Sequence, residues 1–410
     1  MSFRRIVRAI TMTGLITTVQ VACQDTSHVS DRIDFLFSKE EQRVYQALLQ
    51  DPKRTDFSLS VRMGEGLEPL AATAHFRGQS SYRCERKNYT LNLQGRRPGS
   101  VLTDSATDEF FLLSLCKDDY YVRQHTVLQL WTKLGLFPLD FRYVELTIEG
   151  ESRGVYLLVE KLDRLRIVDD ELLAVLRRGS RRGQTHVELK YSHGTVKSPA
   201  ADYNTFTQSL SGLSGTELLA AFRERMDVDQ YLLWVATNTL LRNGDSVDEL
   251  WLLVQDHVDP RGRRSHYYRF AGWDPEDIFK PCHFEGRNAF VDPNGLVYCA
   301  EAEWDHYLFS DPLCYEYYID ILEDVIENRL TEAMFQAACE RTGNELSRFL
   351  SRPQVSAAMI ELIATNPQTI EPAVAKAEIQ KALQELLFNF SRERVKLVER
   401  IAAYRDSLIR

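Results

Sequence analysis

The sequence has no long apolar run and no excess of positive charge. Beyond the N-terminus, no apolar stretch approaches the roughly 18–20 residues that a membrane-spanning helix needs. The net charge is −9 at pH 7 over 410 residues. This balance argues against a general nucleic-acid binder, which needs a basic surface to release counterions. It does not exclude an anionic nucleotide, because a nucleotide needs only a local basic site.

Closely spaced cysteine pairs are also missing. None of the seven cysteines has CxxC spacing, so a structural zinc site is not expected. The six cysteines after Cys23 allow many disulfide pairings. Cys282 and Cys299 bracket a short, turn-rich segment that contains DPNG, and we expect these two to pair.

The first 30 residues resemble a targeting segment followed by a linker. Basic residues at positions 4, 5 and 8 precede a short, modestly apolar stretch and then Cys23. This order predicts a bacterial export signal, which places the protein in the cell envelope or outside the cell. Ala22 before Cys23 suggests a lipid anchor on that cysteine, although Gln20 stands where a leucine is usual. The alternative is a basic N-terminal arm on a cytosolic protein.

Residues 31–163 are predicted to form an N-terminal lobe of sheet and helix. Helical spacing runs from residue 32 to 50, and period-2 alternation predicts strands at 57–63, 71–78 and 87–93. The spacing then predicts a helix over 118–134, with Asp118 or Asp119 as N-cap and Gly135 as the stop. Two strong strands follow at 141–150 and 154–162. The pattern indicates a mixed sheet with one helix packed on it.

Residues 164–410 are predicted to form a larger, mostly helical lobe. Residues 177–183 are expected to be a basic loop, solvated or in contact with phosphate, and residues 228–244 a buried helix. Two strands at 248–255 and 266–273 follow. From Pro312 onward most of the chain has helical spacing, and it ends in a long amphipathic stretch whose apolar face we assign to the core.

One serine lies in a sequence typical of hydrolases. Gly150–Gly154 matches GxSxG, the nucleophile elbow, with Ser152 as the nucleophile. That elbow needs a strand before the serine and a helix after it. Strands are predicted on both sides here, so we expect a hairpin turn, and the hydrolase hypothesis fails unless a helix follows Gly154.

Three segments have the residue types of a phosphate and metal site. FRGQSSYRCERKNYTLNL, residues 76–93, is a basic turn between two strands; it is either a solvated hairpin or a phosphate cradle. NGDSVDELWLLV, residues 243–254, places three acids between a helix and a strand, where they could bind a divalent cation or be a surface turn. FAGWDPEDIF, residues 270–279, places acids directly after an aromatic strand, where Asp274 could bind metal, cap a helix, or both.

The order of these parts is that of a kinase-like phosphotransferase. RGQSS…RKNYTLNL, DDYYVRQHTVLQLWTKLG…FRYVELTIEGESRGVYLLVEKLDR and RNGDS…GWDPED together resemble the CotH kinase family, the atypical kinases related to spore coat protein H. The resemblance runs from about residue 71 to 277. It implies an α+β, protein-kinase-like fold of two lobes. It also implies transfer of phosphate from ATP, with Mg²⁺ or Mn²⁺, to hydroxyl side chains of another exported protein.

The resemblance assigns roles to individual residues. Asp245 matches the catalytic-loop aspartate and would orient or deprotonate the acceptor hydroxyl. Asp274 matches the first aspartate of WDxD and would hold the metal, with Asp248 and Glu276 beside it. Lys87 is expected to pair with phosphate, and the remaining cofactor contacts are assigned to Arg77, Gly78, Ser80 and, at the hinge, Glu160. Arg123 on the helix over 118–134 matches the family's arginine and is expected to order the site.

The sequence departs from the family's pattern within the metal site. Leu250 stands where the family has an asparagine, and Glu276 stands where the second aspartate of WDxD belongs. The helix over 118–134 has no glutamate in its body to pair with Lys87. These departures leave open a non-catalytic surface protein that keeps the fold and uses it for binding.

Overall fold

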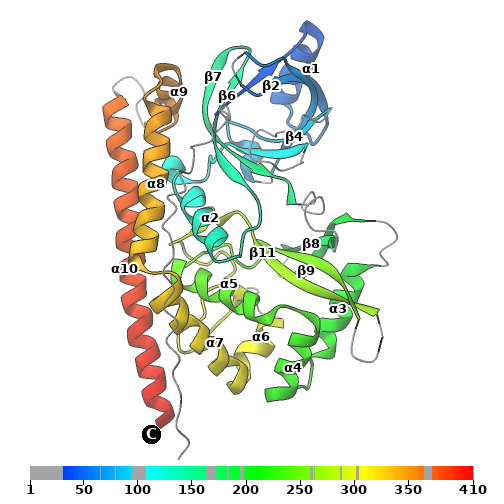
Figure 1. Cartoon of the computed structure of the whole chain (residues 1–410), viewed down its shortest axis with the longest axis vertical. Coiled ribbons are helices and arrows are strands. Elements are labelled where there is room, and N and C mark those ends of the chain that lie inside the picture. Colours follow the sequence, from blue (N-terminus) through cyan, green and yellow to red (C-terminus); the bar gives the residue numbers. More distant parts are fainter. Residues whose placement is uncertain are drawn as a thin grey trace, which may run out of the picture.

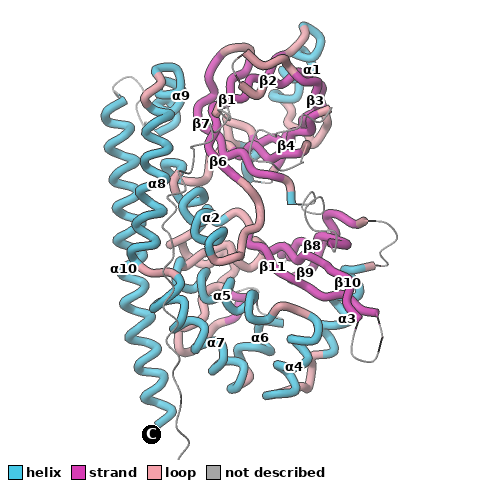
Figure 2. The backbone as a smooth tube through the Cα atoms, viewed as in Figure 1, coloured by secondary structure: helices cyan, strands magenta, loops and turns pink. Residues whose placement is uncertain are grey.

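The computed structural model describes residues 31–64, 66–78, 80–94, 108–162, 172–181, 184–193, 198–258, 262, 264–286, 289–301, 304–363 and 372–409. The expected α+β class is confirmed, since strands and helices come in separate runs along this part of the chain and the sheets are largely antiparallel (Figures 1 and 2). The expected export segment, residues 1–30, and the expected boundary between residues 163 and 164 lie outside it.

The N-terminal strands form a closed barrel in the order β1-β2-β3-β4-β5-β7-β6. Closure comes from β1, which pairs antiparallel with β2 and parallel with β6. Their alternate residues fill the interior with buried aliphatic and aromatic side chains. The strands are β1 (Arg32–Leu36), β2 (Phe57–Arg62), β3 (Leu70–Arg77), β4 (Asn88–Leu93), β5 (Glu109–Leu113), β6 (Phe141–Ile148) and β7 (Glu151–Glu160).

The barrel corrects three expectations. Residues 32–36 form strand β1, and the helix α1 (Lys39–Gln50) begins only after Ser38, whose side chain forms a capping box with Glu41. Strand β5 was not predicted. The mixed sheet with one packed helix is instead a closed barrel, because the first strand returns to pair with β6. The described elements do not by themselves establish the kinase-like arrangement of two lobes.

A second sheet has the strand order β11-β10-β8-β9. It contains β8 (Leu172–Arg181), β9 (Gln184–Ser192), β10 (Leu250–Val258) and β11 (Arg264–Gly272). The β10–β11 pair confirms the two strands expected there. The loop expected at 177–183 is wrong for residues 177–181, which lie within β8 and pair with β9; Arg177 and Arg178 also pair with β10.

Helices surround this second sheet and also reach the barrel. In Figure 1, α8 and α10 run side by side along the left of the molecule, past both sheets. The expected core face of α10 is correct for Ile379, Leu383 and Phe390, whereas Val395 and Val398 are exposed. The helices are α2 (Arg123–Lys133), α3 (Pro199–Ser209), α4 (Gly215–Arg225), α5 (Val228–Leu241), α6 (Trp304–Ser310), α7 (Pro312–Asp324), α8 (Glu332–Leu350), α9 (Pro353–Ile363) and α10 (Pro372–Ile409).

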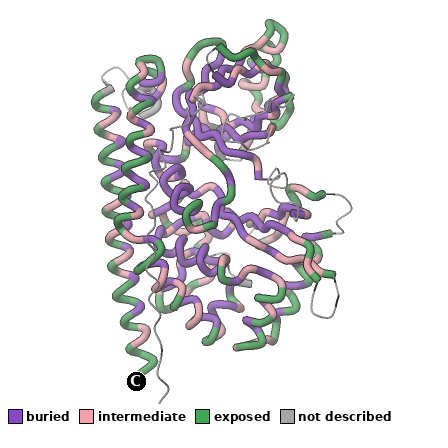
Figure 3. Tube along the Cα trace, in the orientation of Figure 1, coloured by how far each residue is buried: buried purple, intermediate pink, exposed green. Residues whose placement is uncertain are grey.

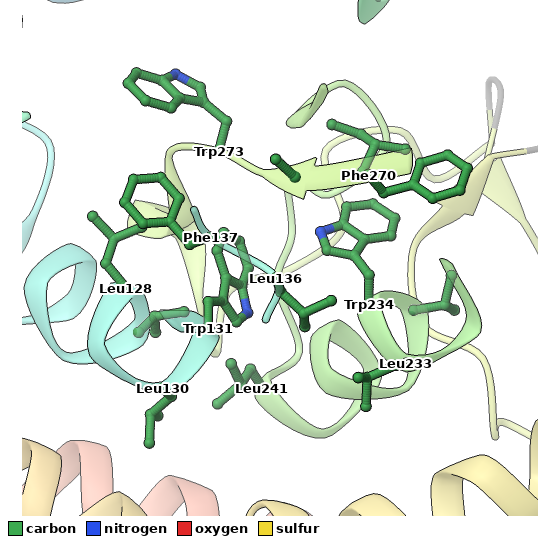
Figure 4. Close-up of a cluster of buried hydrophobic side chains, with 14 of the residues drawn as sticks. Leu128, Leu130, Trp131, Leu136, Phe137, Leu233, Trp234, Leu241, Phe270 and Trp273 are labelled. Carbon is green, nitrogen blue, oxygen red and sulfur yellow. The ribbon is translucent and has the colours of Figure 1, made fainter. Parts of the chain in front are cut away.

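The core between α2, α5 and β11 is tightly packed. Trp131, Trp234 and Trp273 contribute to it (Figure 4), and most of α2 and α5 is buried (Figure 3), without a break over residues 124–131 and 231–241. Gly272, at the end of β11, lies so close to Trp131 that an added Cβ would come within 2.5 Å of the indole ring. This contact leaves no room for a side chain at residue 272, so the end of β11 is fixed against α2.

The expected disulfide between Cys282 and Cys299 is confirmed, and a second joins Cys84 to Cys116. The expected hairpin at Ser152 is also confirmed: β7 continues through it, paired with β6, so no nucleophile elbow forms. No helix among the described residues is both long enough and apolar enough to cross a membrane.

Candidate active site

The acidic loop, residues 243–249, connects α5 to β10. Helix α5 ends at Arg242 in the left-handed conformation, which turns the chain out of the helix. The amide of Gly244 then donates to the carbonyl of Asp277 at 2.9 Å, and the amide of His283 donates to the carbonyl of Gly244 at 2.8 Å. The loop is thus fixed against residues 277–283, a turn that carries one end of the Cys282–Cys299 disulfide.

Three carboxylates of this loop lie together. One oxygen each from Asp245, Asp248 and Glu249 falls within 4.8 Å of the others. Glu249 is buried, and its Oε2 has no hydrogen-bond partner. Burial, followed by the charges of Asp248, Asp277 and Asp274, raises the pKa of Asp245 to about 8. Burial likewise raises the pKa of Glu249 well above its usual value, although Arg177 opposes this.

Asp274 follows the end of β11 and faces the acidic loop. Its backbone is left-handed, with φ of 50°, and the chain then enters a short 3-10 helix, η4 (Pro275–Asp277). Its Oδ1 accepts a hydrogen bond of 2.9 Å from Nε2 of Gln124 on α2. Burial raises the pKa of Asp274, against the nearby positive charges of Arg77 and Arg177. Asp274 occupies the N-cap position of η4 and Pro275 follows at its start, as the capping alternative predicted, but the Asp274 side chain makes no capping hydrogen bond.

Two arginines bring positive charge to these carboxylates. Arg77, the last residue of β3, places its guanidinium 3.7 Å from the ring centroid of Phe111 and 5.5 Å from that of Trp273. Arg177, on β8, donates from Nη2 to Oε1 of Glu249 at 2.9 Å. Burial lowers the pKa of Arg77 to about 10, whereas the charge of Glu249 raises that of Arg177. The site therefore combines groups from the barrel, the second sheet and α2.

Glu276 lies on the α2 side of this cluster. Burial and then the charges of Asp274, Asp277 and Asp118 raise the pKa of Glu276 to about 10. Asp118 accepts hydrogen bonds from the amides of Arg123 and Gln124 at 2.9 and 2.8 Å, so its carboxylate satisfies the first amides of α2. The helix begins only at Arg123, and its N-cap position is Val122 rather than Asp118 or Asp119 as expected. Burial nonetheless raises the pKa of Asp118 to about 7.

Of the residues expected to bind phosphate, only some lie near the carboxylates. Arg77 reaches them, as described above. The ammonium of Lys87 instead donates to the carbonyls of Tyr82 and Cys84 at 2.8 and 2.7 Å, within the basic turn itself. Gly78 has φ of 96° and so provides the left-handed turn after β3. The side chain of Ser80 lies outside the described part of the chain.

Two further predicted residues lie at the edges of this region. Glu160 ends β7, where the chain leaves the barrel, and its Oε2 accepts the amide of Asp140 at 3.2 Å. Arg123 pairs with Asp119 at 2.7 Å. Both positions are compatible with ordering roles, but neither residue contacts the acidic loop through these bonds.

Arg177 was not among the predicted site residues. It was expected only as part of a basic loop over residues 177–183, solvated or in contact with phosphate. The signal that could have found it is the continuous apolar run LLAVL, residues 172–176, which is typical of a buried strand and leads directly into Arg177 and Arg178. Glu249 was noted as an acid but was not included among the metal ligands.

The arrangement fits a divalent cation. Hard cations such as Mg²⁺ prefer carboxylate oxygens, and the unpartnered Oε2 of Glu249 beside Asp245 and Asp248 is a buried acceptor without a donor. Carboxylates with raised pKa values gain from a cation, because its charge stabilises their ionised forms. Converging acids that could hold a cation, together with two arginines, are the charge pattern of a phosphate-handling site.

Such a site, between a barrel and a second sheet, defines an α+β protein with a candidate metal and phosphate site. A family model described as CotH kinase protein matches residues 74–398, and the chain belongs to this family. The match includes Arg77, the acidic loop and Asp274. A search of the curated proteins found no match.

Proposed function

We propose that this protein is an ATP- and metal-dependent kinase with a kinase-like arrangement of two lobes, the barrel and the helical part with the second sheet. The observation that carries the proposal is the convergence of Asp245, Asp248 and Glu249 with Asp274, opposite Arg77 and Arg177. Membership of the CotH kinase family supports the same function.

The metal site is assigned to Asp274 and Asp248, with Glu249 added to the set. Glu276, the remaining predicted ligand, has Asp274 and Asp118 among its charged neighbours, so it stands at the side of the site nearest α2. A bound Mg²⁺ or Mn²⁺ would neutralise charge on the phosphates of ATP. Gln124 would hold Asp274 in place through its hydrogen bond, leaving Oδ2 of Asp274 for the cation.

The phosphates are assigned to Arg77 and Arg177. Arg77 packs over the ring of Phe111 and near that of Trp273, so its guanidinium is oriented before a ligand binds. The remaining expected cofactor contacts, Gly78, Ser80, Lys87 and Glu160, stay in the proposal in supporting roles. Lys87 stabilises the basic turn through the carbonyls of Tyr82 and Cys84 and thereby helps position the chain that follows Arg77.

Asp245 is assigned to the acceptor hydroxyl. The hydroxyl oxygen would attack the γ-phosphorus, the bond from that phosphorus to the bridging oxygen of ADP would break, and the hydroxyl proton would pass to Asp245. A carboxyl group whose pKa is raised to about 8 is better suited to hold that proton than an ordinary aspartate. Most of the remaining catalysis would be positioning and charge neutralisation.

The acceptor is proposed to be another exported protein. The disulfides Cys84–Cys116 and Cys282–Cys299 support an oxidising compartment, in agreement with the export signal predicted from residues 1–30. Contact with a membrane would come through a lipid on Cys23, and the net charge of −9 gives no support for a nucleic-acid partner.

The test is calorimetric titration of ATP into the full chain with Mg²⁺ or Mn²⁺, beside Asp274→Ala. We expect metal-dependent binding that the substitution abolishes. Asp256→Asn is the matched control, because Asp256 is an exposed acid on β10 away from the loop. Transfer of labelled γ-phosphate to the protein itself or to added acceptor proteins would then establish kinase activity.

One observation favours a non-catalytic binding protein instead. Leu250, which stands where the family has an asparagine ligand, is fully buried in β10 and offers no oxygen to a metal. The kinase proposal therefore requires the neighbouring Glu249 to take the place of that asparagine as a metal ligand. Absence of nucleotide binding with either metal, in folded protein, would favour the non-catalytic function.

A further inference from the structure

Arg177 and Arg178 contact the acidic loop from opposite faces of β8. Successive residues of a strand point to opposite sides of the sheet. Arg177 reaches Glu249 on the side of the carboxylates. Arg178 points the other way, and none of its side chain is exposed.

The buried guanidinium of Arg178 is bonded to the backbone of the acidic loop. Its Nε donates to the carbonyl of Val247 at 2.6 Å, and its Nη2 lies 3.5 Å from the carbonyl of Ser246. These two residues lie between Asp245 and Asp248. Arg178 therefore contacts the part of the loop from which two of the carboxylates project.

The other side of the guanidinium is fixed by a buried polar network. The position of Nη1 is restrained by two contacts. It donates a hydrogen bond to the hydroxyl of Tyr231 at 2.9 Å, and it lies 3.7 Å from Oδ2 of Asp305. Tyr231 also donates to Oδ1 of Asp305, and Oδ2 of Asp305 accepts the amide of Glu301 at 2.7 Å. A buried cation is tolerated only when it is paired and hydrogen-bonded, so these bonds hold the guanidinium in one place.

We propose that Arg178 is a positioning residue that fixes the backbone of the acidic loop, and with it the separation of the Asp245, Asp248 and Glu249 carboxylates. The inference rests on the proposed function for its consequence in catalysis. Its structural part, the restraint of the loop, stands on the hydrogen bonds alone. The hydroxyl of Ser246 adds a second restraint by donating to the carbonyl of Cys299 at 2.8 Å.

The first experiment compares Arg178→Met with Arg225→Met in the full chain. Arg225, the last residue of α4, is a matched control: it donates to Asp202 at 2.5 Å and to the carbonyl of His266 at 2.9 Å, and His266 lies toward the end of β11 that is farther from the acidic loop. Binding of Mn²⁺ is measured by electron paramagnetic resonance at a temperature where circular dichroism shows both variants folded. We expect Arg178→Met to weaken Mn²⁺ binding about 10- to 100-fold, as for other residues that orient metal ligands, and Arg225→Met to leave it within about threefold of the unsubstituted protein.

The second experiment is hydrogen exchange, which reports on the loop whether or not a metal binds. Arg178→Met is expected to speed amide exchange at residues 243–249 selectively, and Arg225→Met is not. Arg178→Lys keeps the charge beside Asp305 but cannot reach both carbonyls, so it provides a folded variant with an intermediate effect if Arg178→Met does not fold.

Unchanged exchange at residues 243–249 in a folded Arg178 variant would overturn the inference. Faster amide exchange with unchanged Mn²⁺ binding would show that Arg178 restrains the loop but does not set the separation of the three carboxylates, and would overturn that part of the inference. If the unsubstituted protein binds no Mn²⁺, the proposed function fails, and the exchange result still decides whether Arg178 holds the loop.

Discussion

Gly244 and Pro281 lie so close that a Cβ on Gly244 would be 2.2 Å from the carbonyl oxygen of Pro281. The obstacle is backbone, which cannot rotate away as the end of a side chain can. Two hydrogen bonds connect the same segments, from Gly244 to Asp277 and from His283 to Gly244. This approach brings the acidic loop and the turn after Asp274 together, so the relation between Asp245 and Asp274 depends on it.

Gly244→Ala should therefore separate the two segments. We expect the free energy of unfolding to fall by about 1–3 kcal/mol, the usual cost of overpacking, and Mn²⁺ binding to weaken. Gly179→Ala is the control, because its Cβ would meet only the His186 side chain, at 3.2 Å. Denaturant unfolding and Mn²⁺ titration measure the two effects. Equal losses in both variants would show that the contact with Pro281 has no special role.

The crowded carboxyl groups predict an unusual dependence of stability on pH. Their pKa values are raised on folding, to about 7 for Asp118 and about 8 for Asp245. Groups of this kind stabilise the fold fully below their unfolded pKa near 4, and that contribution is lost as pH rises through the folded values. We expect the melting temperature of the metal-free protein to fall between about pH 5 and pH 9.

A divalent cation should reverse this trend. Because binding favours the ionised carboxylates, Mn²⁺ affinity should rise with pH, and the stabilisation by Mn²⁺ should be larger at pH 8 than at pH 6. Asp245→Asn should reduce both the pH dependence and the response to Mn²⁺. Thermal denaturation with and without the metal measures this, and a response that does not change with pH would contradict the assignment.

The two disulfides are expected to differ in their effect on the site. Each closes a loop whose loss should cost about 3 kcal/mol of stability. The Cys282–Cys299 disulfide also joins the turn beside Gly244 to Cys299, whose carbonyl accepts a hydrogen bond from the hydroxyl of Ser246. We expect the double substitution of Cys282 and Cys299 by serine to weaken Mn²⁺ binding more than the same change at Cys84 and Cys116. Equal binding in the two folded variants would oppose this.

Arg77 and Lys87 offer a direct comparison on the phosphate side. Arg77→Met removes the guanidinium that faces Asp274, and we expect binding of ATP with metal to weaken at least tenfold. Lys87→Met removes hydrogen bonds to two carbonyls of the basic turn, so we expect a loss of about 1–2 kcal/mol in stability and a smaller loss of ATP binding. Calorimetry separates the two effects. A larger binding loss in Lys87→Met would restore Lys87 to the direct phosphate role.

Most of the charged residues of the candidate site could be identified from the sequence. The acids at 245, 248 and 274 stand out because they interrupt apolar segments, and the basic turn at 77–87 stands out by composition. Local patterns also predicted β2, β3, β4, β6, β7, α5 and the β10–β11 pair, because period and turn residues act over a few positions. The pairing of Cys282 with Cys299 followed from their position around one turn.

Two features depended on tertiary structure: the closure of the barrel, and which basic side chains lie beside the carboxylates. Strand β1 has too few residues for its pairing with β6, more than 100 positions away, to be read from its own pattern. The positions of Arg77 over Phe111 and Trp273 and of Arg177 at Glu249 are likewise long-range outcomes. The sequence by itself determined which charged groups are present. The packing of barrel against sheet decided which of them meet, because the free energy of a charge depends on burial and on neighbours that only the folded chain brings close.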